Sequence, residues 1–114
     1  MKLTLPWGCL CSDNQRVGGM VGKLTRRYRT GKEAAHMCAM LQVKDKLEGD
    51  VKVSLTFYPP DKRRRDTSNL EKLIFDALEG VCYTDDNQIT IHTNIREKPD
   101  RENPRVEIEI EEVT

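Results

Sequence analysis

The sequence has no hydrophobic run long enough to cross a membrane and no segment that would separate two domains. None of its apolar runs approaches the roughly 18 residues that a membrane-spanning helix requires. No stretch rich in proline, serine or glycine interrupts its 114 residues, and the N-terminus carries no apolar signal segment. We therefore expect one soluble domain, residues 1–114, with no membrane partner.

Cysteines are few, and their spacing does not match a common zinc site. The pairs Cys9 with Cys11 and His36 with Cys38 each enclose a single residue, whereas zinc knuckles enclose about two to four. Disulfides are not expected either, because no signal segment directs the chain to an oxidising compartment and its length supports a core without them. We expect reduced thiols that are buried or half-buried.

Net charge is also absent, since 19 basic side chains balance 19 acidic ones. The balance conceals two opposite halves. Residues 1–72 carry fifteen Lys and Arg against eight Asp and Glu, a net charge of +7, and residues 73–114 carry four against eleven, a net charge of −7. This asymmetry fits a phosphate-facing surface followed by a metal-binding acidic cluster. It equally fits salt bridges between the two halves.

Hydrophobic periodicity predicts an α+β domain. Apolar and polar residues alternate in four segments, which predicts strands, and apolar residues recur at helical spacing in two others. The expected order is strand, loop, helix, strand, helix, strand, strand, with the two main helices packed on a mixed sheet. The expected strands cover residues 1–7, 51–58, 89–95 and 106–111, and the expected helices cover about 32–47 and 70–81.

The second helix has the clearer boundaries. Ser68 and Glu71 have the spacing of a capping box, and Gly80 stands where a helix commonly ends. In the first helix, Met37 and Met40 exceed what one core needs. They predict either a broad core or the surface of a dimer.

Residues 16–32 predict a flexible basic loop that grips DNA. This segment contains six basic side chains and four glycines, and it has no acidic side chain. Gly22 and Lys23 do not form a phosphate-binding loop, because the first glycine is missing at the required distance and Leu24 replaces the metal-binding Ser or Thr. No nucleotide cofactor is expected. The basic residues of this loop are Arg16, Lys23, Arg26, Arg27, Arg29 and Lys32.

The most informative stretch is a run of four cations followed by a carboxylate. Lys62, Arg63, Arg64 and Arg65 directly precede Asp66. Cations hold backbone phosphates, and carboxylates hold Mg²⁺, which polarises a scissile phosphate and supplies hydroxide from bound water. The alternative is a basic turn before an ordinary helix cap, with the later Asp85 and Asp86 at another turn.

This stretch resembles the signature of the RusA family of Holliday junction resolvases. The family pattern joins a proline-aspartate, a basic run, Asp-x-Asp-Asn-Leu-x-Lys, Phe-Asp-Ala-Leu and a later Asp-Asp. The opening Leu5-Pro6-Trp7 and the later strands fit the family layout as well. The matching residues are Pro60-Asp61, Lys62 to Arg65, Asp66 to Lys72, Phe75 to Leu78 and Asp85 to Ile89.

The resemblance implies a homodimeric, Mg²⁺-dependent endonuclease that resolves four-way junction DNA by paired symmetric nicks in recombination and repair. It implies a place in the bacterial cytoplasm, with the gene belonging to the host, a phage or a prophage. Asp66 and Asp86 correspond to catalytic, metal-binding carboxylates, and Lys72 corresponds to the catalytic cation. Asp85 is a further candidate ligand. Asn69 supports the site, and Lys62, Arg63, Arg64 and Arg65 contact phosphates.

One position departs from the family pattern. Ser68 stands where the family has its second aspartate, and a hydroxyl is a weaker ligand for a hard divalent cation than a carboxylate. Asp85 or water fills this place, or the chain binds junctions while cleaving them weakly or not at all.

A second question concerns Asp86, which follows the expected helix. Either the chain returns toward Asp66 or a partner subunit supplies this carboxylate.

Overall fold

The computed structural model describes residues 1–12 and 25–113, and this part contains one four-stranded sheet. In space the strands follow the order β1-β4-β2-β3. β2 and β3 run parallel, and the other two neighbouring pairs are antiparallel. The expected mixed sheet is confirmed. Its strands are β1 (Lys2–Pro6), β2 (Val51–Tyr58), β3 (Ile89–Arg96) and β4 (Arg105–Glu112).

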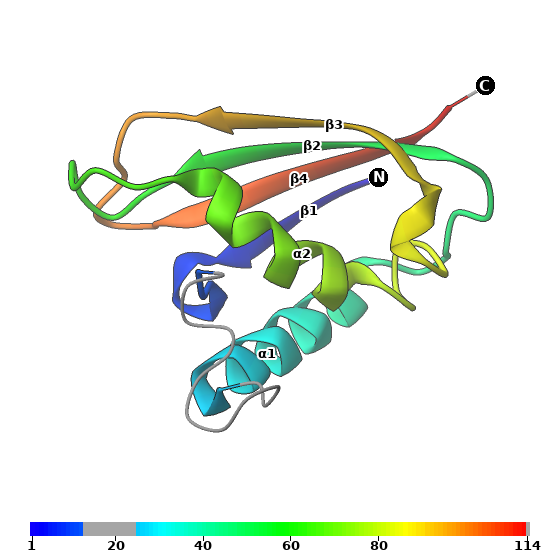
Figure 1. Cartoon of the computed structure of the whole chain (residues 1–114), viewed down its shortest axis with the longest axis horizontal. Coiled ribbons are helices and arrows are strands. Elements are labelled where there is room, and N and C mark those ends of the chain that lie inside the picture. Colours follow the sequence, from blue (N-terminus) through cyan, green and yellow to red (C-terminus); the bar gives the residue numbers. More distant parts are fainter. Residues whose placement is uncertain (13–24, 114) are drawn as a thin grey trace.

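Two helices, α1 (Arg26–Gln42) and α2 (Glu71–Leu78), lie on the same side of the sheet (Figure 1). Burial alternates along β2, so that every second side chain joins the core with the buried side chains of both helices. The element order and the α+β class are therefore as expected. Three short 3₁₀ helices complete the described part, namely η1 (Trp7–Cys9), η3 (Thr67–Leu70) and η4 (Asp86–Gln88).

The prediction of a flexible loop over residues 16–32 is wrong for residues 26–32, because α1 begins at Arg26. Thr25 caps this helix, and its Oγ1 accepts a hydrogen bond of 3.2 Å from the backbone N–H of Tyr28. Tyr28 is only 1% exposed and anchors the first turn in the core. The basic side chains that flank it, Arg27 and Arg29, are exposed, as is Arg26. The rest of the expected loop, with Arg16 and Lys23, lies outside the described residues.

Both helices end earlier than their apolar patterns predict. α1 stops at Gln42 because Val43 is extended, and the backbone N–H of Leu47 instead donates to Cys82 O at 2.8 Å. α2 stops at Leu78, and Gly80 follows with a φ of +85° that favours glycine. The expected capping box at Ser68 is not formed, since η3 precedes α2 and Asp66 caps η3.

Three further expectations concern membrane-spanning helices, the cysteines and the methionines of α1. No helix among the described residues has the length and apolar character needed to span a membrane. All four cysteines are free thiols, and burial raises the pKa of Cys82 to about 11. Met37 is 66% exposed and Met40 is also exposed, so neither belongs to a broad core.

Candidate active site

The basic run lies on a turn that Asp61 organises. Asp61 Oδ1 accepts a hydrogen bond of 2.9 Å from the N–H of Arg63 and lies 2.8 Å from Nη2 of Arg65. These contacts hold the pKa of the Asp61 carboxyl below its usual value, the backbone hydrogen bond from Arg63 having the largest effect. Lys62, Arg63 and Arg64 remain exposed. The turn thus presents three cations to solvent.

Arg65 differs from the other three cations because its guanidinium is held by the protein. Its side chain is 19% exposed, and Nη1 donates to the backbone oxygens of Asp61 and Arg63 at 3.2 and 3.1 Å. Its Cζ lies 5.5 Å from the ring centroid of Trp7, a cation–π contact. Arg96 from β3 donates to the backbone oxygen of Arg65 at 2.7 Å. Arg65 therefore fixes the turn directly before Asp66.

Asp66 and Ser68 are joined by two hydrogen bonds. Asp66 Oδ1 accepts from the N–H of Ser68 at 3.1 Å and from its hydroxyl at 2.5 Å. Both bonds end on Oδ1 of this exposed carboxylate, and neither involves Oδ2. The Ser68 hydroxyl orients Asp66 by donating a hydrogen bond, whereas the carboxylate of an ionised aspartate at this position could only accept hydrogen bonds.

Asp66 lies in a surface pocket of about 300 Å³ with cations on its walls. Four residues that the sequence analysis named as candidates line this pocket, namely Arg27 from α1, Arg65, Asp66 and Asn69. Trp7 also lines the pocket and was not predicted as a site residue, although it belongs to the opening Leu5-Pro6-Trp7 motif. The complete lining is Trp7, Leu10, Ser12, Arg27, Arg65, Asp66, Asn69 and Leu70.

Lys72 is on the first turn of α2, where its side chain is 46% exposed. Its Nζ lies 3.0 Å from Asp76 Oδ1, one helical turn further along α2. The second oxygen of the same carboxylate, Asp76 Oδ2, accepts a hydrogen bond of 2.7 Å from the Tyr28 hydroxyl. A buried phenol from α1 therefore also binds the carboxylate that pairs with Lys72.

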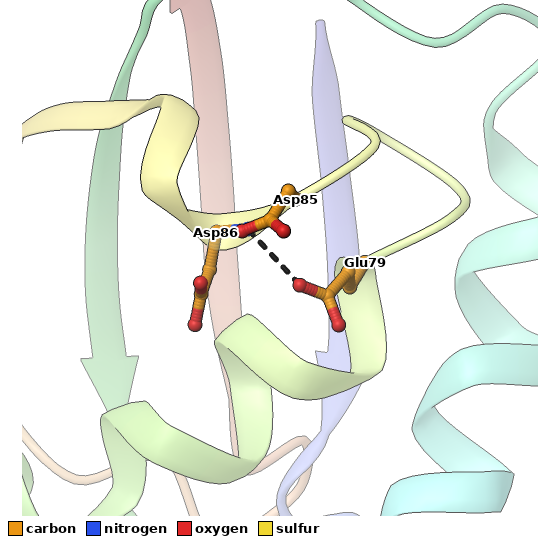
Figure 2. Close-up of side chains that lie close together, drawn as sticks. All are labelled: Glu79, Asp85 and Asp86. Atoms are coloured by element: carbon orange, nitrogen blue, oxygen red, sulfur yellow. Dashed lines mark hydrogen bonds between the residues drawn. The ribbon is translucent and has the colours of Figure 1, made fainter.

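Three exposed carboxylates gather at the other end of α2 (Figure 2). Glu79, Asp85 and Asp86 each offer an oxygen within 4.8 Å of the others, and the N–H of Asp86 donates to Glu79 Oε1 at 3.0 Å. Asp85 also caps η4, where its Oδ1 accepts from the N–H of Asn87 at 2.9 Å. We call these three residues the acidic cluster. Glu79 was not predicted, because it lies outside the Asp85-Asp86 motif.

The acidic cluster does not include Asp66. Asp66 precedes α2 and Glu79 follows it, so the two stand at opposite ends of this helix (Figure 1). Eight residues of helix span about 12 Å at 1.5 Å per residue. The connection after α2 stays at its C-terminal end, where Cys82 N–H donates to Leu78 O at 2.9 Å. One chain therefore presents Asp66 and Asp86 in two separate places.

Comparison with known proteins gives consistent matches. The family model described as Endodeoxyribonuclease RusA matches residues 10–111. Crossover junction endodeoxyribonuclease RusA of Escherichia coli (strain K12) is 33% identical over 117 residues, which cover 98% of this chain and 94% of that protein. The protein of the same name from Enterobacteria phage 82 is 33% identical over 63 residues, covering 55% of this chain and 52% of that protein.

Proposed function

The chain belongs to the RusA family of crossover junction endodeoxyribonucleases, and we propose that it resolves four-way DNA junctions by paired, Mg²⁺-dependent nicks. The main support for this proposal is the pocket that Asp66 lines together with Arg27, Arg65 and Asn69. It combines a carboxylate for a metal with cations for a phosphodiester. The natural setting is recombination and repair in the bacterial cytoplasm, with a host, phage or prophage gene.

The donor set fits Mg²⁺. Asp66 and all members of the acidic cluster are exposed carboxylates, and hard divalent cations prefer such oxygens. When bound, Mg²⁺ supplies hydroxide from water and polarises the phosphate. Among the cluster, Asp86 corresponds to the metal-binding carboxylate of the family pattern, whereas Asp85, like Asp66, also caps a 3₁₀ helix. Glu79 adds a third carboxylate, which offsets the missing aspartate at position 68.

The protein's own side chains position the DNA strand. The exposed cations of the turn, Lys62, Arg63 and Arg64, neutralise phosphates beside the pocket. Arg65 holds the turn in place, and Asn69 lies on the pocket wall with its backbone N–H donating to Asp66 O at 3.1 Å. Lys72 provides a positive charge where negative charge develops on the reacting phosphate. In this proposal, these cationic side chains act on the DNA strand that Asp66 and its metal ion cleave.

A homodimer accounts for the separation of Asp66 from the acidic cluster. If a two-fold axis relates two subunits so that their α2 helices lie antiparallel, Asp66 of one subunit lies close to the acidic cluster of the other. The same operation creates a second, identical site, because a two-fold interface repeats each contact. Two equivalent sites match the two strands that must be cut in a four-way junction. We therefore propose that each active site uses carboxylates from both subunits.

The direct test of this function is incubation of the protein with a synthetic four-way junction and Mg²⁺. We expect paired nicks at symmetric positions in two opposed strands, no product in EDTA, and no product from linear duplex of the same sequence. Denaturing gels with each strand labelled in turn measure the result. A retarded protein–junction band without any nicked product would instead identify a non-catalytic junction-binding protein. This alternative is favoured by Ser68, which stands where the family has an aspartate.

The substitution Ser68→Asp is expected to raise the nicking rate several-fold and to lower the Mg²⁺ concentration needed for half-maximal rate. The new carboxylate adds a ligand beside Asp66. Without metal, the variant loses the 2.5 Å hydrogen bond from the Ser68 hydroxyl and gains repulsion between neighbouring carboxylates, so its melting temperature falls. Titrating Mg²⁺ against the single-turnover rate tests this expectation.

The matched control is Ser68→Ala, which removes the same hydrogen bond without adding a ligand. This control is expected to nick more slowly than the unmodified protein, since Asp66 loses one of the two hydrogen bonds that orient it. If the Ser68→Asp variant binds junctions normally but nicks no faster than the Ser68→Ala variant, the lack of a carboxylate at position 68 does not limit the nicking rate.

A further inference from the structure

We infer that Asp76 and Tyr28 are positioning residues for the ammonium group of Lys72, an assignment that rests on the proposed function. Three groups form a continuous chain of hydrogen bonds. The Tyr28 hydroxyl donates to Asp76 Oδ2 at 2.7 Å, and Lys72 Nζ donates to Asp76 Oδ1 at 3.0 Å. The carboxylate thus uses one oxygen for the buried phenol and the other for the ammonium.

The chain of contacts differs from an ordinary surface ion pair. A surface pair between two long, exposed side chains is weak, because neither end is fixed. Here Asp76 is only 22% exposed, and Tyr28 is 1% exposed within the core. The phenol fixes the carboxylate from a second helix, across 48 positions of sequence. Asp76 consequently offers Lys72 an acceptor at a defined place.

This anchor also connects Lys72 to the pocket that contains Asp66. Tyr28 lies on the first turn of α1, next to Arg27, which lines the pocket. Lys72 follows η3, which Asp66 caps. The contact between Tyr28 and Asp76 therefore joins α1 to α2 beside the proposed catalytic groups. A small displacement of a reacting group reduces rate far more than binding.

Two substitutions test the assignment. Tyr28→Phe removes the hydroxyl and keeps the ring, and Asp76→Asn keeps the shape and removes the charge. Each is expected to lower the single-turnover nicking rate about tenfold while junction affinity changes less than about twofold, since the ammonium acts in the transition state. Asp76→Glu is expected to recover part of the rate lost in the asparagine variant, because it restores the negative charge.

The matched control is Tyr83→Phe. The Tyr83 side chain is also fully buried and also contacts α2, where its hydroxyl donates to Phe75 O at 2.6 Å. Its removal costs a buried hydrogen bond without touching the pair of Lys72 and Asp76. We expect a lowered melting temperature and an unchanged nicking rate for this control, which separates loss of stability from loss of positioning.

The decisive comparison repeats Tyr28→Phe and Asp76→Asn in a Lys72→Ala background. If both act through Lys72, neither lowers the residual rate of Lys72→Ala any further. The assignment is overturned if Lys72→Ala is strongly impaired while Tyr28→Phe and Asp76→Asn nick as fast as Tyr83→Phe. It is also overturned if their effects persist fully without Lys72. An unmodified protein that does not nick junctions would instead refute the proposed function, and the assignment with it.

Discussion

Replacing either Asp66 or Asp86 with asparagine is expected to reduce junction nicking by about a thousandfold or more while leaving junction binding intact. Asparagine keeps the size of the side chain but replaces a charged metal ligand with a neutral one. Asparagine at position 66 can still accept the hydrogen bonds that Ser68 donates, so the cap of η3 is kept. Single-turnover rates in Mg²⁺ and gel-shift affinities in EDTA measure the two effects separately.

Asp85→Asn is the matched control for Asp86→Asn. Asparagine preserves the cap of η4, where Asp85 Oδ1 accepts from the N–H of Asn87 at 2.9 Å. We expect this control to lose much less activity than Asp86→Asn. A large loss in the Asp85 variant and a small one in the Asp86 variant would exchange their roles. Nicking by Asp66→Asn at the unmodified rate would contradict the assigned metal site altogether.

The sequence predicts β2 well because burial along this strand is a local pattern. Residues 51–58 alternate apolar and polar side chains, and β2 covers the same residues with alternating burial. The α+β class and the order of the elements follow from such patterns. The spatial order of the strands was not predicted, because pairing depends on contacts between distant segments.

The local sequence pattern does not predict where α1 begins. The basic residues and glycines before residue 32 indicate a loop, yet Arg26 begins the helix. Tyr28 supplies the missing stabilisation through its burial and its hydrogen bond to Asp76. That partner lies 48 positions away, so no local pattern around residue 28 contains it.

The sequence predicts which residues are candidates for the site, but not how they are arranged in space. Motif spacing identifies Asp66, Asn69 and Arg65, which share one pocket. It does not identify Glu79, whose relation to Asp86 depends on where α2 ends and how the chain turns at Gly80. It also cannot decide how Asp66 and Asp86 combine, because in the proposed homodimer that depends on a second subunit.

Mixing two inactive variants is expected to restore nicking if each site draws on both subunits. In a dimer of one Asp66→Asn chain and one Asp86→Asn chain, one site combines the two unmodified carboxylates, and the other combines the two substituted residues. The intact site can nick one strand. If each chain instead provided both carboxylates of its own site, both sites in this mixed dimer would carry one substitution, and neither would nick.

The most direct test of an active site shared between subunits is therefore the nicking rate of coexpressed Asp66→Asn and Asp86→Asn chains on a four-way junction in Mg²⁺. Random assembly makes about half of the dimers mixed, each with one intact site of two, so we predict single nicks at about a quarter of the unmodified protein's rate. Each variant alone should remain inactive. Mixed dimers that form, as native mass spectrometry would show, and bind the junction but do not nick it would contradict a site shared between subunits.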